Sequence, residues 1–147
     1  MVTHADDDSA VLRDADTGQV HTLSANEGLT ADEVIEATVA PEPPMGVTYE
    51  LRDLHASRSV RIEAVREPPT TQSREIAADQ PVGEVTRQER AGDGELHVLS
   101  VPESETESAV DDVLDDRETR LVQAARAGAS LVEVRSEPGV VAVRYLP

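Results

Sequence analysis

This chain has to build its interior almost without aromatic side chains. It contains no Phe and no Trp, and its two tyrosines are Tyr49 and Tyr145. Burial therefore depends on Val, Leu, Ile and Ala, which each remove less area from water than an aromatic ring. With 147 residues, of which 38% are hydrophobic, the chain is expected to form one domain or two small ones with a shallow core.

Acidic residues dominate the charge. The sequence has 30 acidic and 13 basic residues, a formal net charge of -17, and Arg at every basic position. Concentrated salt screens the self-repulsion of such a chain, because the Debye length falls to about 3 Å in molar salt. The composition resembles that of proteins from salt-in halophilic archaea, so we expect an environment rich in potassium chloride.

Other features of the sequence exclude whole classes of protein. The lack of Cys excludes disulfides, thiolate nucleophiles and Cys-ligated zinc. No apolar stretch approaches the roughly 18 residues of a membrane span, and the N-terminus lacks the pattern of a signal peptide. We therefore predict a cytoplasmic protein. Regular apolar alternation with well-placed turns disfavours the alternative of a disordered acidic tail.

Short β-rich runs separated by turn residues fill the first half of the chain. They are predicted at residues 2–5, 9–14, 19–24, 33–39, 47–52 and 59–65, with residues 54–58 as a connection. Short strands in so few residues favour a barrel, because closure removes exposed edges. We therefore predict a small β-barrel over residues 1–67. Because the first run is so short, the barrel is allowed to start upstream of Met1.

The segment from Gly28 to Val39 refines this prediction. Its loop glycine and acidic residues precede a β-rich run, an order that resembles the barrel-closing segment of OB-fold-like domains. The resemblance implies an OB-like barrel, which would contact nucleic acid at a strand-loop-strand position. The local concentration of basic residues lies at such a position, and its members are Tyr49, Arg52, Arg58 and Arg61. Pairing of these arginines with the abundant acids is the alternative explanation.

The second half combines strands with helices. A helix is predicted at 71–78, and strands at 84–90 and 95–101 flank the turn Ala91-Gly-Asp-Gly94. Helices follow from a capping box at Ser104-x-x-Glu107 to the terminator Gly128, with a break at Asp115-Asp-Arg117. Strands at 131–135 and 140–145 are joined by a Pro-Gly turn. This order predicts an α+β domain over residues 68–147, in which helices cover one face of an antiparallel sheet.

Four segments of the chain together resemble a haloarchaeal family of uncharacterised proteins. They are Val2 to Asp14, Glu36 to Met45, Arg87 to Val98 and Val140 to Pro147. The resemblance implies a halophilic host and the pairing of two domains. It supplies no catalytic residue.

One short motif suggests phosphatase chemistry. Asp14-Ala-Asp16-Thr17 matches the D-x-D-x-T signature of aspartate-nucleophile phosphatases. That chemistry needs a buried parallel strand before the motif and further phosphate and magnesium ligands downstream. Here Arg13 precedes the motif and a second β-rich run follows at once. We therefore predict a hairpin loop.

Other polar residues are candidates for metal binding or catalysis. His4 with Asp6, Asp7 and Asp8 offers metal ligands, but neither spacing nor ligand number fits a standard loop, so a solvated surface is expected. His21, His55 and His97 lie in separate segments, and each is expected to be half-buried, with no acid placed beside it as a partner in general base catalysis. We predict no catalytic residue, metal or cofactor.

Two classes of function therefore rank ahead of an enzymatic function. The first is a macromolecule-binding module that contacts RNA or a ribonucleoprotein through the surface from Tyr49 to Arg61. The second is a protein-interaction or scaffolding protein, and a metal-dependent phosphatase-like enzyme ranks below both. Arginines that converge on one face favour nucleic acid, whereas arginines dispersed among acids favour a protein partner.

Overall fold

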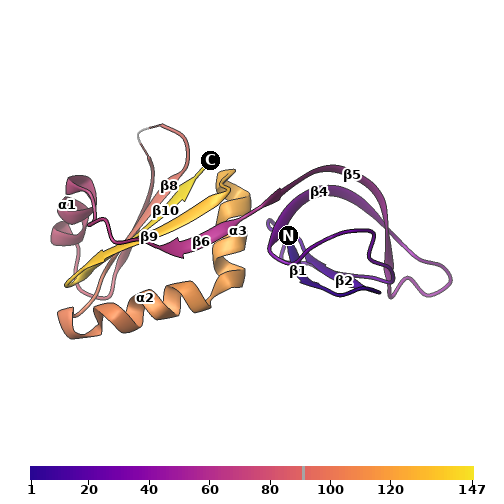
Figure 1. Cartoon of the computed structure of the whole chain (residues 1–147), viewed down its shortest axis with the longest axis horizontal. Coiled ribbons are helices and arrows are strands. Elements are labelled where there is room, and N and C mark those ends of the chain that lie inside the picture. Colours follow the sequence, from indigo (N-terminus) through magenta and orange to yellow (C-terminus); the bar gives the residue numbers. More distant parts are fainter. Residues whose placement is uncertain (91) are drawn as a thin grey trace. The chain divides into compact units, whose positions relative to one another are not determined.

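A computed structural model describes residues 1–90 and 92–147 of the chain. These residues form two compact units, Met1–Val60 and Arg61–Pro147. Each unit has its own five-stranded sheet (Figure 1). The sequence predicts the domain boundary after residue 67 instead, with the run at 59–65 in the first domain.

The first unit is built from strands alone. Its strands are β1 (Val2–Ala5), β2 (Ala10–Arg13), β3 (Val20–Leu23), β4 (Glu33–Pro41) and β5 (Tyr49–Ser59). They lie in the order β1-β2-β3-β5-β4, with β3 and β5 parallel and the other neighbours antiparallel. Buried Val, Leu and Ala side chains form the core, as the composition predicts, and they are Val2, Ala10, Leu12, Leu23 and Leu29.

The predicted closed barrel is wrong, because the sheet of the first unit is open. Strands β1 and β4 are its two edges. A backbone hydrogen bond from Asp32 N to Val2 O, 3.0 Å long, joins the segments near these edges. Strand β1 has four residues and a register shift between Val2 and His4, and it pairs with β2 and not with β4.

The predicted connection at residues 54–58 is also wrong, because these residues belong to β5. This strand pairs with β4 from Tyr49 to Ser59, through two register shifts. Its middle residues are exposed, including Leu54 at 48%. The alternation of apolar and polar residues changes phase between Leu51 and Leu54, so the sequence does not show one continuous strand here.

The second unit contains five strands and three α-helices. The strands are β6 (Arg61–Ala64), β7 (Val85–Glu89), β8 (Glu95–Ser100), β9 (Leu131–Glu137) and β10 (Val140–Leu146). The helices are α1 (Thr71–Asp79), α2 (Thr106–Asp115) and α3 (Arg117–Ala127), with the 3-10 turn η1 (Glu103–Glu105) before α2. The predicted hairpins on either side of the helices are confirmed by the pairs β7–β8 and β9–β10.

The sheet of the second unit is mixed, which corrects the predicted antiparallel sheet. Its order is β6-β9-β10-β8-β7, and β6 runs parallel to β9. The sequence predicts that the run that forms β6 belongs to the first domain. Local sequence did not show this parallel pairing because β6 and β9 are about 70 residues apart and joined by no turn.

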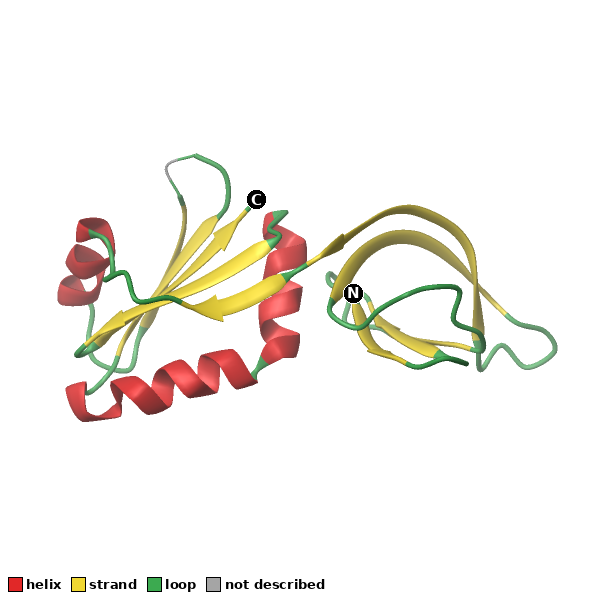
Figure 2. Cartoon of the chain, in the orientation of Figure 1, coloured by secondary structure: helices red, strands yellow, loops and turns green. Residues whose placement is uncertain are grey.

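Helices cover both faces of this sheet, not one (Figure 2). On one face, Ala77 of α1 packs against Leu96, Val98 and Ala142. The residues that point to the opposite face of the sheet are also buried, among them Val141 and Val143 of β10 and Val132 of β9. Helices α2 and α3 contact β9 and β10 and cover that second face.

The ends of the helices follow local side-chain chemistry. Asp116 caps α3 by accepting a hydrogen bond from Thr119 N, and Gly128 ends it in the left-handed region with φ 68°. The predicted break at residues 115–117 and the terminator at Gly128 are confirmed. The predicted capping box at Ser104 is wrong, because Ser104 lies in η1 and α2 begins at Thr106 without a side-chain cap.

In the predicted turn Ala91-Gly-Asp-Gly94, Ala91 lies outside the described residues.

Candidate interaction surface

The predicted binding residues begin with Tyr49, at the start of β5. Its ring meets the His21 ring edge-on, with centroids 4.6 Å apart. It also packs against the core of the first unit and is half-buried. Tyr49 therefore closes one side of this core and offers only part of its ring to solvent.

The three predicted arginines are divided between the chain's two sheets, with Arg52 and Arg58 in the first unit and Arg61 in the second. Arg52 of β5 pairs with Glu50 at 2.8 Å, and Arg61 of β6 pairs with Glu63 at 3.4 Å. Arg58 lies six residues beyond Arg52, roughly 20 Å at the usual rise of a strand, opposite Val34. Arg61 belongs to the second unit. Two of the three arginines are thus paired with a neighbouring acid.

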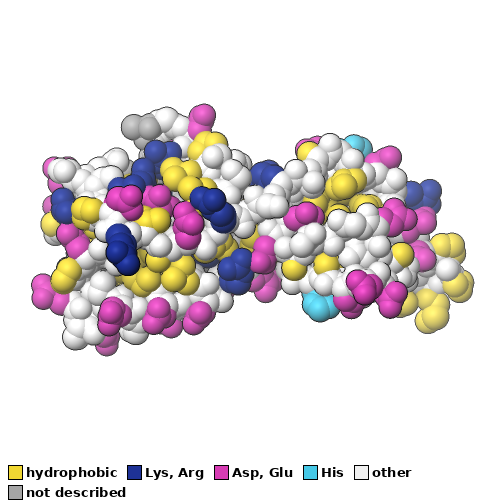
Figure 3. All heavy atoms as spheres, viewed as in Figure 1, with side chains coloured by type: hydrophobic (Ala, Val, Ile, Leu, Met, Phe, Trp, Pro, Cys, Tyr) yellow, Lys and Arg dark blue, Asp and Glu magenta, His cyan; other side chains and the backbone are white. Residues whose placement is uncertain are grey.

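A run of exposed apolar residues lies in the loop between β4 and β5. Met45 is 79% exposed and Val47 is 70% exposed. The prolines of the same loop, Pro43 and Pro44, are exposed too. Figure 3 shows hydrophobic side chains gathered at the end of this hairpin, at the right of the view. We call the side chains of Pro43, Pro44, Met45 and Val47 the apolar tip.

Hydrogen bonds within the loop fix the apolar tip in place. Glu42 N donates to Thr48 O at 2.9 Å, and Gly46 N donates to Glu42 O at 2.8 Å. Gly46 has φ 66°, which favours glycine. The Glu42 carboxylate accepts a hydrogen bond from Ser24 Oγ, so the loop is also tied to the residue after β3. Two backbone hydrogen bonds thus close the loop, and the side chains of Met45 and Val47 are exposed.

The phosphatase-like motif is a hairpin loop, as predicted. Asp14 Oδ1 accepts hydrogen bonds from Asp16 N at 2.8 Å and Thr17 N at 3.0 Å. These backbone donors lower the pKa of Asp14. Gly18 completes the turn with φ 75°, and β2 and β3 pair on either side. The carboxylate of Asp14 therefore organises the loop.

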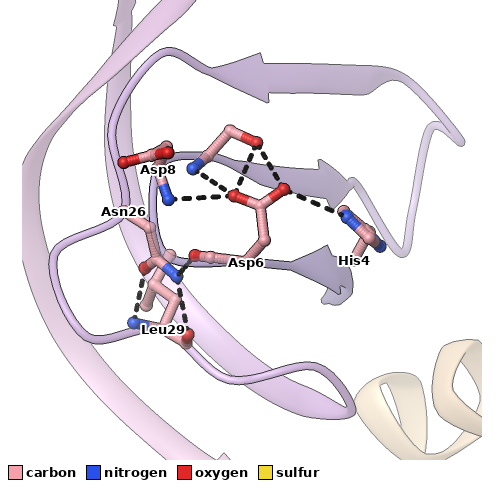
Figure 4. A network of polar contacts seen from close by, with 6 residues as sticks. His4, Asp6, Asp8, Asn26 and Leu29 are labelled. Atoms are coloured by element: carbon pink, nitrogen blue, oxygen red, sulfur yellow. Dashed lines mark hydrogen bonds and ion pairs between the residues drawn. The ribbon is translucent and has the colours of Figure 1, made fainter.

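The acidic cluster near the N-terminus is likewise a turn (Figure 4). Asp6 Oδ1 accepts hydrogen bonds from Asp8 N at 2.9 Å and Ser9 N at 2.7 Å, and His4 Nε2 lies 3.5 Å from Asp6 Oδ2. Asn26 Nδ2 donates to Asp6 O at 2.7 Å and ties this turn to the next loop. Within residues 1–90 and 92–147, no three His, Asp or Glu side chains are grouped to hold a metal ion.

A cluster that sequence analysis missed lies inside the second unit. His97 of β8 is 4% exposed, and its Nε2 lies 2.9 Å from Glu95 Oε2. His97 is therefore fully buried, not half-buried as expected, and an acid lies beside it. The spacing of two residues along one strand was the available signal, because such residues share a face. His21 is half-buried as expected, whereas His55 is exposed.

Burial controls the charge states in this cluster. Desolvation lowers the pKa of His97, and the hydrogen bond to Glu95 opposes this effect. Desolvation also raises the pKa of Tyr145 to about 12. The Tyr145 hydroxyl and the Arg120 Nε are buried and lack a hydrogen-bond partner among the described residues. His97 and Tyr145 are shielded from solvent, and β10, which carries Tyr145, contacts α3.

The fold defines a sheet-rich protein of two compact units, whose clearest surface feature is the apolar tip. The chain belongs to a family of unknown function (DUF5812), whose family model matches residues 1–136. No curated protein and no solved structure matches the chain. Among the residues that the structure describes, no helix has the length and apolar character needed to cross a membrane.

Proposed function

We propose that this protein is a protein-interaction module that binds its partner through the apolar tip. The observation that carries the proposal is the exposure of Met45 and Val47 side by side on a chain with a net charge of -17. Apolar side chains that gather on a polar surface mark contact sites for other proteins. Met is also suited to such contacts, because its flexible thioether adapts to the shape of a partner.

The distribution of charge supports a protein partner over nucleic acid. The acids beside Arg52 and Arg61 compensate these two arginines locally. Nucleic-acid binding depends on basic side chains that neutralise phosphates, and a net charge of -17 opposes it. Base stacking would require a more accessible ring than Tyr49, which is half-buried beside His21.

The proposal includes a salt-rich cytosol as the setting for this contact. The excess of acids and the exclusive use of Arg as the basic residue support it. Burial of apolar surface is strengthened by some salts and is not screened as charge pairs are. An apolar contact therefore suits a partner that must bind in concentrated salt.

Site-specific photo-crosslinking tests the proposal. A photoreactive residue replaces Met45 in one variant and Val20 in the control, because Val20 is also an exposed apolar residue of the first unit, at 56%. Both variants are irradiated in lysate kept in concentrated potassium chloride, with and without nuclease. We expect a defined protein adduct at position 45 that resists nuclease and is absent at position 20. Equal labelling at both positions, or loss of the adduct after nuclease, would contradict the proposal.

A paired substitution sharpens the test. Met45→Ser combined with Val47→Ser removes the apolar surface and leaves the hydrogen bonds of the loop backbone in place. We expect this variant, with a photoreactive residue at Pro44, to lose the adduct. Val20→Ser with the same photoreactive residue is the matched control and should retain it.

A further inference from the structure

Among residues 1–90 and 92–147, strand β7 pairs with β8 alone, and the structure gives its outer edge no second strand. It stands last in the order β6-β9-β10-β8-β7. On the side of β8, Glu84 O accepts a hydrogen bond from Ser100 N at 3.0 Å, and Arg90 N donates to Gly94 O at 3.1 Å. Backbone groups alternate in direction along a strand. The N–H and C=O groups of Val85, Arg87 and Glu89 therefore point away from β8.

The side chains along this edge are exposed. Val85 is 44% exposed, and Arg87 and Glu89 are also exposed. Within the part of the chain that the structure describes, neither Arg87 nor Glu89 forms an ion pair. Both charges are thus available to a strand that pairs with the outer edge.

The charge pattern of β7 is complementary to itself in one register. Two antiparallel copies related by a two-fold axis at Gln88 place Arg87 opposite Glu89 of the second copy, and this pair occurs twice. A two-fold axis at Arg87 would instead place two arginines opposite each other, which is unfavourable. The favourable register also brings together residues whose backbone groups point outward.

We propose that a second copy of this chain pairs antiparallel with β7 and extends the five-stranded sheet across a two-fold axis at Gln88. Edge strands often carry charges that prevent such pairing. Here the alternation of Arg87 and Glu89 opposes the register with its axis at Arg87 and favours the one with its axis at Gln88. The contact is isologous, as expected for a homodimer. It uses the second unit and is independent of the apolar tip.

Charge exchange across the pair tests the inference. The mass of the full chain is measured in concentrated and in moderate potassium chloride by sedimentation equilibrium over a range of protein concentrations. The wild type should be a dimer. Arg87→Glu and Glu89→Arg, each alone, should weaken association by about tenfold or more, because like charges then face each other twice. The variant with both substitutions restores opposite charges and should recover the dimer.

A matched control separates this effect from the change in net charge. Arg66→Glu reverses an exposed arginine outside β7 and should leave the dimer intact. Circular dichroism verifies that each variant keeps the wild-type secondary structure. A monomeric wild type, single variants that dimerise normally, or a double variant that stays monomeric would each overturn the inference.

Discussion

The rings of His97 and Tyr145 lie with their centroids 4.7 Å apart on neighbouring strands of the second unit. Tyr145 is the largest fully buried side chain of the described residues. In a chain with two tyrosines and no Phe or Trp, this pair supplies the bulkiest contact in the interior. The stability of the second unit therefore depends on both residues.

Truncation of Tyr145 should strongly destabilise the second unit. Tyr145→Ala leaves a cavity, and we expect the free energy of unfolding to fall by about 3 to 5 kcal/mol. Tyr145→Phe removes only a buried hydroxyl that has no hydrogen-bond partner among residues 1–90 and 92–147, so it should be neutral or stabilising. Chemical denaturation of both variants checks this difference. A large loss in Tyr145→Phe would show that the hydroxyl has a partner after all.

His97 should make stability depend on pH below neutrality. Burial lowers the pKa of His97 in the folded state, so the unfolded state binds the proton more tightly. The contribution of neutral His97 is therefore complete above about pH 6.5, the ordinary histidine value. It declines as the pH falls from there toward the lowered folded-state pKa. Denaturation at a series of pH values should show this decline in the wild type and a smaller one in His97→Gln.

Gly94 should be the least replaceable glycine of the β7–β8 turn. A Cβ at Gly94 would lie 2.0 Å from Tyr145 O, whereas a Cβ at Gly92 would meet nothing within 4 Å. Both glycines have positive φ, 101° and 107°, so the cost of backbone strain is shared. We expect Gly94→Ala to lower the free energy of unfolding by about 1 to 3 kcal/mol more than Gly92→Ala, because a backbone contact must yield. Equal losses would contradict this account.

The hairpin at Asp14 gives a prediction about its glycine. Gly18 has φ 75°, so Gly18→Val should destabilise the first unit by about 1 to 2 kcal/mol. Gly18→Asn is the control, because Asn tolerates this conformation. Asp14→Asn should not remove any magnesium-dependent phosphate ester hydrolysis by the protein. A wild-type activity that disappears in Asp14→Asn would restore the phosphatase hypothesis.

Concentrated salt should stabilise the fold. A net charge of -17 on two small units with aliphatic cores produces self-repulsion that salt screens. We expect the free energy of unfolding to rise as potassium chloride increases from about 0.1 M to about 3 M, with the largest gain where the Debye length shrinks from about 10 Å. Stability that is independent of salt would contradict this expectation.

Local turn chemistry was sufficient to predict much of the secondary structure. Gly18 and Gly139 mark hairpins that the structure confirms, and Gly128 marks the end of α3. Sheet closure was not predictable in this way. It depends on whether residues as distant as Val2 and Asp32 form a ladder, and no local pattern reports that register.

The candidate site was harder to predict than the hairpins. Met45 and Val47, which follow two prolines in the sequence, are the signal for an exposed apolar loop, but no periodic pattern shows that they are exposed. The partner of His97 was overlooked because Glu95 became significant only once both were assigned to the same face of β8. In both cases the residues can be found in the sequence. The exposure of a side chain, and the face of the sheet on which it lies, depend on the tertiary fold.

The two tyrosines are divided between the two compact units, with Tyr49 in the first and Tyr145 in the second. Since the chain has no Trp, tyrosine emission is its only strong intrinsic fluorescence. Tyr145→Phe leaves a probe in the first unit, and Tyr49→Phe leaves one in the second. Each half of the molecule can therefore be observed separately as it unfolds, without an added label, and any difference between the two transitions measures how far the halves depend on each other.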